Sequence, residues 1–314
     1  MAKMRVGIIG AGRIAVVMAE TLRKMRGVEA YAIASRSLEK AQAFAFEHGM
    51  TKAYGSYEEM LQDKKLDLVY IATPHTLHLT HAKLCIDYGK PVLVEKPFCV
   101  NAAQAQELLD YAKEKGIRVA NVKGYSTEAV AQLTLALCLE LIEHTSRYDS
   151  YVKSHQYEKD KVFSFFGYSF HELSTMTWGI VGLGAIGQRV ARIAEALGCQ
   201  VQYYSTTGHH QDEHFKQVDF DTLLKTSDII SIHSPLTKET EHLFNAEAFK
   251  KMKDTAYLIN VGRGPIIDEE ALSDALNNNL IAGAGLDVFE KEPLPSTSPL
   301  YSVDPQKVVF TPHV

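Results

Sequence analysis

The sequence predicts an α/β protein in which two doubly wound parallel sheets follow one another along the chain. Three observations support this fold class: a length of 314 residues, strand and helix patterns that alternate throughout, and glycine-rich turns that begin at Gly10 and Gly182. Domains average about 150 residues, so the length suits two of them. Parallel strands need a crossover, usually a helix, between them. Alternating strand and helix patterns therefore indicate parallel sheets.

The composition is ordinary for a globular protein and argues against several kinds of partner. Apolar residues make up 46% of the chain and charged residues 23%, with a formal net charge of −5. This charge offers no attraction for nucleic acid or an anionic membrane. No apolar run approaches the roughly 18 residues that cross a bilayer. The first strand begins too close to the N-terminus to leave room for a signal peptide.

The cysteines indicate the compartment. Cys85, Cys99, Cys138 and Cys199 stand far apart in apolar or helical surroundings, and no two have Cys-x-x-Cys spacing. Such cysteines are typical of reduced core residues, so we expect a cytoplasmic protein.

The first half begins with a strand at residues 5–9, which runs into the turn Gly10-Ala11-Gly12-Arg13-Ile14-Ala15. The further elements expected are a helix at about 14–25, a strand at 28–34, a helix at 38–48, a short strand near 53, a helix from 57, and strands at 66–72 and 91–94. Ligands of doubly wound sheets bind beyond the carboxyl ends of the strands. We therefore expect chemistry at Thr73-Pro74 and at Glu95-Lys96-Pro97, which follow the last two strands.

The second glycine-rich turn has the full Gly-x-Gly-x-x-Gly spacing. Gly182, Gly184 and Gly187 stand between an apolar run at 179–181 and an amphipathic helix. The first glycine permits a tight turn, the second lets a pyrophosphate approach the backbone, and the third lets helix and strand pack closely. The helix N-terminus presents free amides and the positive end of its dipole to the phosphates. We therefore expect a dinucleotide cofactor, NAD or NADP.

The residues that select between NAD and NADP lie at the end of the second strand in each half. NAD-selective sites usually have Asp or Glu there for the ribose hydroxyls. The first half has Ser35-Arg36 instead, which either favours the 2′-phosphate of NADP or leaves Arg36 on a solvated loop. The second half has Ser205-Thr206, so it either accepts NADP or holds the ribose through hydroxyl groups and water.

Two groups of closely spaced histidines raise the question of a metal site. They are His75, His78 and His81 in the first half, and His209, His210 and His214 in the second. Metal sites usually combine histidine with suitably spaced cysteine or carboxylate ligands, which the first group lacks. We expect that group to flank a cofactor loop or to face solvent. We interpret the second group as part of a loop beside acidic residues, and expect no metal.

The second half opens with a long helix at about 127–144. Ser126 is its expected N-cap, and Glu128 is favourably placed in its first turn. Apolar residues lie nearly all round this helix, so we expect it to be buried in the core or in a subunit interface. Residues 148–174 are aromatic and irregular, and either pack on the core or cover an interface. Strands are expected at 200–204, 228–233, 256–261 and 308–310, and a helix at 268–277.

Three polar residues lie just past strand ends of the second half, namely Arg263, Glu292 and His313. Each alone could be a surface residue, but together they supply what hydride transfer with a 2-hydroxy or 2-oxo acid requires. A guanidinium can grip a carboxylate or polarise the neighbouring carbonyl group. An imidazole can exchange the hydroxyl proton near neutral pH. A carboxylate can orient that imidazole and raise its pKa.

The first half resembles the cofactor domain of the Gfo/Idh/MocA oxidoreductase family over about residues 4–120. The similarity is carried by the turn at Gly10 and by Ala34-Ser35-Arg36, Ala72-Thr73-Pro74 and Glu95-Lys96-Pro97. In that family the lysine of Glu-Lys-Pro lies near the nicotinamide and the substrate, which implies a catalytic role for Lys96. The family continues into a large, mostly antiparallel sheet domain, and nothing after residue 120 has that pattern.

The second half resembles the D-isomer-specific 2-hydroxyacid dehydrogenases over about residues 116–314. The similarity is carried by Asn121-Val122-Lys123-Gly124-Tyr125-Ser126-Thr127-Glu128, the turn at Gly182, Asn260-Val261-Gly262-Arg263-Gly264, Leu286-Asp287-Val288-Phe289 with Glu292, and Thr311-Pro312-His313. It implies that Arg263 binds the substrate, Glu292 assists and His313 is the acid/base. It also implies that Asp287 helps to hold the nicotinamide carboxamide and tunes His313.

The two resemblances also imply which residues contact the cofactor. In the first half these are Gly10, Gly12, Arg13, Ile14, Ser35, Arg36, Thr73, Pro74 and Glu95. In the second half they are Gly182, Gly184, Ala185, Ile186, Gly187, Ser205, Thr206, His233, Pro235, Val261, Gly262 and Asp287.

The resemblances divide the chain into a Gfo/Idh/MocA-like domain at residues 1–120 and a D-2-hydroxyacid dehydrogenase-like NAD(P)-binding domain at 121–314, with a long helical arm near its start. We infer a chimera of two cofactor domains. The leading hypothesis is an NAD(P)-dependent D-2-hydroxyacid dehydrogenase acting on a small 2-oxo or 2-hydroxy acid. The alternatives are a sugar or polyol dehydrogenase that uses Lys96, and a nucleotide-binding protein without efficient catalysis. Helix 127–144 is expected to form a homodimer.

Overall fold

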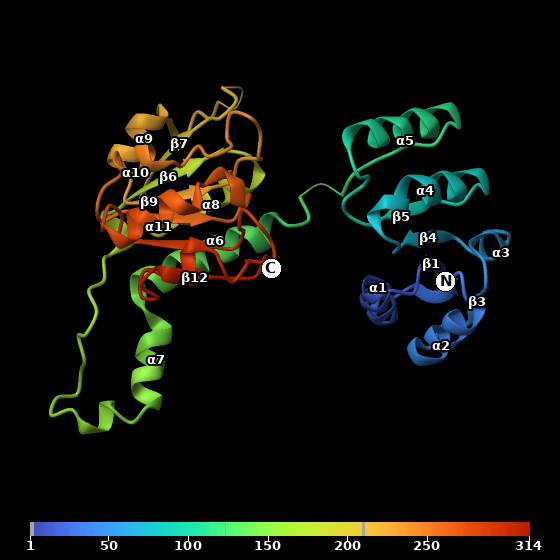
Figure 1. Ribbon diagram of the computed structural model, residues 1–314, viewed down its shortest axis with the longest axis horizontal. Coiled ribbons are helices and arrows are strands. Elements are labelled where there is room, and N and C mark those ends of the chain that lie inside the picture. Colours follow the sequence, from blue (N-terminus) through green and yellow to red (C-terminus); the bar gives the residue numbers. More distant parts are fainter. Residues whose placement is uncertain (1–2, 123, 209–210) are drawn as a thin grey trace. The chain divides into compact units, whose positions relative to one another are not determined.

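The computed structural model describes residues 3–122, 124–208 and 211–314. The chain divides into two compact units, Met1–Asn121 (unit 1) and Val122–Val314 (unit 2). Each unit contains one wholly parallel sheet between helices (Figure 1), which confirms the predicted fold class. Lys123, His209 and His210, which the sequence singled out, lie outside the described residues.

Unit 1 has a five-stranded sheet in the order β3-β2-β1-β4-β5. Its elements are β1 (Met4–Ile9), α1 (Arg13–Lys24), β2 (Val28–Ala34), α2 (Leu38–His48), β3 (Lys52–Tyr54), α3 (Tyr57–Leu61), β4 (Leu68–Ile71), the short 3-10 helix η1 (His75–Leu77), α4 (His78–Asp87), β5 (Val92–Val94) and α5 (Ala102–Glu114). Helices α1 and α2 cover one face of the sheet, and α3, α4 and α5 cover the other. Each face therefore has its own apolar layer.

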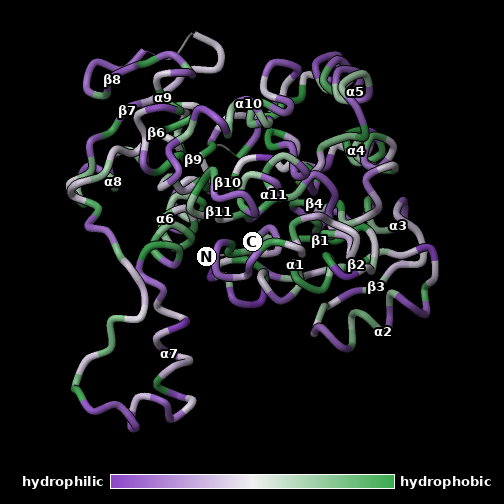
Figure 2. Tube along the Cα trace, turned by 60° about the vertical axis from the view of Figure 1, so that its left-hand side comes forward, coloured by the Kyte–Doolittle hydropathy of each residue, from purple (hydrophilic) through white to green (hydrophobic). Residues whose placement is uncertain are grey.

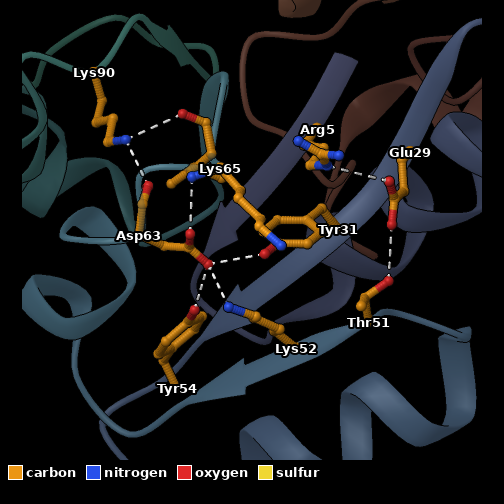
Figure 3. A network of polar contacts seen from close by, with 10 residues as sticks. Arg5, Glu29, Tyr31, Thr51, Lys52, Tyr54, Asp63, Lys65 and Lys90 are labelled. Atoms are coloured by element: carbon orange, nitrogen blue, oxygen red, sulfur yellow. Dashed lines mark hydrogen bonds and ion pairs between the residues drawn. The ribbon is translucent and has the colours of Figure 1, made fainter. Parts of the chain in front are cut away.

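A hydrogen-bond network around Asp63 lies in unit 1 (Figure 3). One carboxylate oxygen of Asp63 accepts hydrogen bonds from the hydroxyl groups of Tyr31 and Tyr54 and from the ammonium group of Lys52, at 2.9, 2.7 and 2.7 Å. The other oxygen accepts the backbone N–H of Lys65 at 2.9 Å. This carboxylate therefore joins β2 and β3 to the loop that follows α3.

The segment where the two resemblances overlap, at residues 116–120, follows the last helix of unit 1. Helix α5 ends at Glu114, and residues 117–120 form no strand. The N–H of Ile117 donates to the carbonyl of Ala112 at 2.8 Å and so closes the helix. An N–H that caps a helix cannot also pair with a neighbouring strand. Strand β5 is therefore the edge of the sheet.

Unit 2 has a seven-stranded sheet in the order β12-β11-β10-β9-β6-β7-β8. Its elements are α6 (Thr127–Glu143), α7 (Thr145–Lys153), η2 (Tyr157–Lys159), η3 (Leu173–Thr175), β6 (Thr177–Val181), α8 (Ala185–Ala196), β7 (Gln200–Tyr204), β8 (Lys216–Gln217), α9 (Phe220–Thr226), β9 (Ile229–Ile232), α10 (Ala246–Phe249), β10 (Tyr257–Asn260), η4 (Gly264–Ile266), α11 (Glu269–Asn277), β11 (Gly283–Leu286), η5 (Pro299–Ser302) and β12 (Val308–Phe310). Helices α6 and α8 cover one face, and α9, α10 and α11 the other. No helix of the described residues is long and apolar enough to cross a membrane.

Helix α6 corrects two expectations. Its buried residues lie along one face, which packs against α8, β10 and β11, whereas Gln132, Ala136 and Glu143 are exposed. The helix is therefore a layer of the unit 2 core and not buried all round. Ser126 also makes no side-chain cap hydrogen bond, because its backbone is already helical, with φ −101° and ψ 0°. A capping side chain needs an extended backbone at that position.

Residues 145–172 form an arm that extends away from the unit 2 sheet in both views (Figures 1 and 2). Its rings pack mainly on each other, as in the stacked pair Tyr151 and Phe165, whose centroids are 4.1 Å apart. Helix α7 has no buried residue. Phe163 is 91% exposed and Phe166 84% exposed. The interpretation of this segment as a loop that packs on the core is therefore wrong.

Candidate active site and cofactor sites

Each glycine-rich turn lies where the strand order of its sheet reverses. In unit 2, strands β7 and β8 lie on one side of β6, and β9 to β12 lie on the other side. Gly182 directly follows β6. Gly182 has φ +90°, and a Cβ there would lie 2.9 Å from the backbone nitrogen of Ser234, just past β9. In unit 1, Gly10 has φ +95° and faces Thr73, just past β4. Such reversal points are where doubly wound sheets bind ligands.

The helices after these turns begin with unoccupied amide groups. Gly12 precedes α1 and Gly184 precedes α8, and neither helix has a side-chain cap. By contrast, Ser37 caps α2 and Asp268 caps α11. A Cβ added at Gly12 or Gly184 would meet no atom within 4 Å, so the space before each helix is open. Open space next to free amides suits a pyrophosphate.

The unit 2 turn also has two buried polar atoms without a partner among the described residues. They are Nδ1 of His233 and Oγ of Ser234. Ser234 is only 3% exposed. Buried polar groups are normally hydrogen-bonded, so unpaired ones indicate a missing ligand or water. Pro235 follows directly on the same loop. These residues fit a bound dinucleotide.

The loops that would face the ribose differ between the units. Ser205 follows β7 and is buried, and its hydroxyl accepts the N–H of Gly208 at 3.1 Å. Thr206 beside it is half-exposed. In unit 1, Ser35 is half-buried and Arg36 is exposed. The guanidinium of Arg36 is therefore accessible to a phosphate, whereas the Ser205 hydroxyl is engaged in its own loop.

The Glu95-Lys96 segment of unit 1 is fixed through its carboxylate. Glu95 accepts the hydroxyl of Tyr70 at 2.7 Å and the backbone N–H of Lys96 at 2.6 Å. Burial and the Glu95 bond raise the pKa of Tyr70 far above its ordinary value. Lys96 itself is exposed at the carboxyl end of β5. Pro74, Arg13 and Ile14 are exposed as well, at the same edge of the sheet.

Two of the first-half histidines do not face solvent, which corrects that expectation. His78 and His81 are buried in α4, and only His75 is exposed. His78 bridges the carbonyl of Pro97 and the carbonyl of Thr73, at 2.8 and 3.0 Å. It therefore ties together the loops that follow β4 and β5. The signal in the sequence was the three-residue spacing, which puts His78 and His81 on one helix face.

His313 and Glu292 form a directly bonded pair in unit 2. Nδ1 of His313 lies 2.7 Å from a carboxylate oxygen of Glu292, and the other oxygen accepts the N–H of Phe289 at 3.0 Å. Burial raises the pKa of Glu292, but the bonds to His313 and Phe289 and the charge of Arg263 outweigh it, so the net pKa is lowered. Arg263 is exposed on the neighbouring loop after β10. The structure thus brings His313 and Glu292 into direct contact, with Arg263 near enough for its charge to act on Glu292.

Asp287 contacts the loop that follows β12. Its carboxylate accepts the hydroxyl of Thr311 at 2.6 Å and the N–H of Val314 at 3.1 Å. Its carbonyl accepts the N–H of His313 at 2.9 Å. Asp287 therefore holds the loop after β12 against the end of β11, and it positions His313 through the backbone and not through the ring.

A cavity of about 550 Å³ adjoins this pair. Its polar lining comes from Glu292, Thr311 and His313. The rest is apolar and consists of Phe289, Pro293, Leu294, Tyr301, Phe310 and Pro312. Small-molecule sites are commonly cavities of ~300–1,000 Å³ with apolar walls and a few converging polar groups. Among the described residues, no three metal-binding side chains cluster in a way that could hold an ion.

These two parallel sheets, each with a glycine-rich turn at its reversal point, define a double Rossmann-type dinucleotide-binding protein. Residues 135–314 match the NAD-binding domain of the D-isomer specific 2-hydroxyacid dehydrogenases. The chain belongs to this family. Residues 4–122 match the NAD-binding Rossmann fold of the Gfo/Idh/MocA oxidoreductase family. Both resemblances recognised in the sequence are therefore confirmed, as is the expectation of an NAD-type cofactor.

Two curated relatives and one solved structure show the similarity in numbers. The chain is 40% identical over 205 residues to a hydroxypyruvate reductase of Blautia hydrogenotrophica and 43% identical over 207 residues to a glyoxylate reductase of Thermofilum pendens. These matches cover 65% of this chain and 63% and 60% of the two relatives. An NADPH-dependent glyoxylate/hydroxypyruvate reductase of Sinorhizobium meliloti is 30% identical, with a TM-score of 0.54 over 62% of this chain and 75% of that protein.

The site also contains residues that the sequence did not reveal. Ser231 lies inside β9 and is fully buried, with its hydroxyl between Trp178 and His233. A polar residue within an otherwise apolar strand was the available signal. The sequence also did not show that the hydroxyl of Thr73 lies 2.9 Å from Nδ1 of His81.

Proposed function

We propose that the chain is an NAD(P)-dependent D-2-hydroxyacid dehydrogenase whose chemistry belongs to unit 2. The observation that carries this proposal is the bonded pair of His313 and Glu292 beside Arg263, at the carboxyl edge of the sheet. A nicotinamide supplies or accepts hydride when bound. The open space at Gly184 and the unpaired atoms at His233 and Ser234 support such a ligand at the same edge.

The protein side chains have separate roles in this proposal. Glu292 accepts a hydrogen bond from Nδ1–H of His313, which leaves Nε2 to exchange a proton with the substrate oxygen. In the direction of reduction, Nε2 protonates the carbonyl oxygen of a 2-oxo acid. Arg263 binds the substrate carboxylate through its planar guanidinium. In this proposal His313 thus supplies the proton, Glu292 orients the His313 ring and Arg263 binds the substrate carboxylate.

The substrate class follows from charge and space. A cavity with largely apolar walls, lined by His313 and by a Glu292 carboxylate that feels the charge of Arg263, suits a small anion that carries a short carbon chain. The two relatives are named for hydroxypyruvate and glyoxylate, and both compounds are 2-oxo acids. We propose that this chain reduces small 2-oxo acids of that kind. Unit 1 would add a second nucleotide site, which Arg36 biases toward NADP.

The test is reduction of a panel of 2-oxo acids with NADH and with NADPH. We expect His313→Gln to lower kcat/KM by about 10²–10⁴-fold, because the proton donor is lost while the fold is kept. His214→Gln is the matched control, since His214 forms a similar 2.7 Å pair with Glu195 outside this site. Turnover that survives His313→Gln unchanged would refute the assigned role.

A second function is favoured by the Glu95-Lys96 segment. The Glu95 carboxylate holds the Lys96 backbone in place at the carboxyl end of β5, and Lys96 is exposed there. We propose as the alternative a sugar or polyol dehydrogenase that uses Lys96. Oxidation of such alcohols that disappears in Lys96→Ala and survives Arg263→Ala would support it. Cofactor binding without turnover on either panel would point instead to a nucleotide-binding protein.

We further propose that the chain forms a homodimer through the outer surface of α6 and the arm at residues 145–172. The exposed rings of Phe163 and Phe166 support this assembly, because monomers rarely leave large apolar patches in water. Light scattering of the full chain should give about twice the 34.9 kDa of one chain. A monomeric mass would contradict the proposal. Phe163→Ser combined with Phe166→Ser should produce the monomer.

We also propose that the protein works in the cytoplasm. Its four cysteines are buried free thiols, which suits a reducing compartment. Recovery of the protein in a membrane or extracellular fraction would contradict this location.

A further inference from the structure

A chain of hydrogen bonds through Trp178, Ser231 and the half-buried His233 connects the unit 2 core to the glycine-rich turn. Nε1 of Trp178, on β6, donates to the hydroxyl oxygen of Ser231 at 2.9 Å. The same hydroxyl lies 2.9 Å from Nε2 of His233. Trp178 and Ser231 are both fully buried. Within the described residues these are the two contacts of the Ser231 hydroxyl, so its single hydrogen has one acceptor, the ring of His233.

The direction of these hydrogen bonds determines the tautomer of His233. Burial lowers the pKa of His233 to about 3, so the ring is neutral and one nitrogen donates while the other accepts. If Nε2 accepts from Ser231, the proton lies on Nδ1, and one buried donor is left unpaired. If Nε2 donated instead, the Ser231 hydrogen and the bare Nδ1 would both be unpaired. An unpaired buried group costs about 1–3 kcal/mol, so the first arrangement is favoured.

The unpaired Nδ1–H is located at the predicted ligand site. His233 and Ser234 directly follow β9, and their backbone stands against Gly182, the first glycine of the turn. The hydroxyl of Ser234 is also buried and unpaired. Two donors without acceptors therefore meet at the point where the sheet reverses. The complementary ligand atoms are oxygens that accept hydrogen bonds.

We propose that Ser231 and Trp178 are positioning residues that hold His233 as the Nδ1–H tautomer. In this state the His233 ring and the Ser234 hydroxyl donate to acceptor oxygens of the dinucleotide bound at the Gly182 turn. The inference rests on the proposed nucleotide site of unit 2. The inference assigns the specificity of this loop to two hydrogen-bond donors, His233 and Ser234. Ser231 and Trp178, which do not touch the ligand, determine which nitrogen of His233 carries the proton.

The first test is the tautomer of His233, measured by NMR on full-length protein with labelled histidine. We expect the Nδ1–H form in the wild type without cofactor, and a shift toward the Nε2–H form in Ser231→Ala. Ser227→Ala is the matched control, because Ser227 is equally buried, lies two residues before β9 and bonds Gln202. A wild-type ring in the Nε2–H form would overturn the proposal.

The second test is calorimetry of NAD⁺ binding, carried out in a Gly10→Val background to close the unit 1 turn. We expect Ser231→Ala to weaken binding by about 3–10-fold, the effect of misdirecting one donor. Ser227→Ala should lower stability and leave the affinity unchanged. Equal affinities in wild type and Ser231→Ala would overturn this inference alone. Absence of binding in the Gly10→Val protein itself would overturn the unit 2 nucleotide site and the inference together.

Discussion

The contacts of the Glu292 carboxylate determine how acid changes its contribution to the stability of the folded protein. Its pKa is lowered in the folded protein, since the bonds to His313 and Phe289 outweigh burial. A lowered pKa adds stability above the ordinary range of about pH 4–4.5, and this contribution disappears as the pH falls through the folded value. Folding therefore favours the ionised form of this group.

We expect Glu292→Gln to destabilise unit 2 more at pH 6 than at pH 3. The measurement is urea unfolding followed by tryptophan fluorescence, which reports unit 2 because Trp178 is the only tryptophan. A difference between variant and wild type that is the same at both pH values would contradict the assigned contacts. Because Glu292 is about one third exposed, solvent screening keeps the effect small.

Residue types at strand ends and the pairing of Glu292 with His313 could be predicted from the sequence, and most of the other hydrogen bonds could not. Arg263 and His313 were identifiable because parallel topology brings the carboxyl ends of all strands to one edge. The contacts of Asp287 and Ser231 depend on side-chain direction, which spacing along the chain does not determine. The site was therefore predictable as a set of residues with one pairing, and not as a full hydrogen-bond network.

Among the elements, β2, α2, β7 and β12 have the bounds that the sequence predicted. Their patterns end at clear signals, such as Gly49 after α2, which has φ +66°. Helix 127–144 was placed correctly, and one face of it is buried in the unit 2 core. An apolar helix surface does not show whether the core, a partner or solvent covers it.

The Asp63 network gives unit 1 an acid-sensitive joint between β2 and β3. Burial raises the pKa of Asp63. The hydrogen bonds from Lys52, from the N–H of Lys65 and from the two tyrosines lower this pKa by a larger amount, so the net pKa is well below its ordinary value. As for Glu292, a lowered pKa adds to the stability of the folded state above about pH 4, and this contribution is lost on acidification.

We expect Asp63→Asn to lower the thermal midpoint of unit 1 by several degrees at pH 7, and by less at pH 3. Circular dichroism of the full chain measures both units, and tryptophan fluorescence separates the unit 2 contribution. Glu59→Gln, an exposed change on the nearby helix α3, is the control. A fall in the fluorescence midpoint instead of the dichroism midpoint would show that the network does not act within unit 1.

At the scale of the whole molecule, two glycine-rich turns predict two nucleotide sites on one chain. We expect calorimetry to give about two dinucleotides per chain, with the unit 1 site preferring NADP because of Arg36. Gly182→Val should remove one site, since a side chain there meets the backbone of Ser234 at 2.9 Å. Gly89→Ala also has a positive φ but open surroundings, lies between α4 and β5, and should leave both sites. One dinucleotide per wild-type chain would contradict the prediction.

Every strand of the described residues pairs within its own unit, and each sheet is complete in its own run of sequence. A joint near residues 121 and 122 therefore interrupts no strand ladder on either side. In evolutionary terms, such a joint lets recombination exchange one half for another gene segment without breaking a sheet. The present pairing of two families in one reading frame is the kind of product that this permissive joint allows.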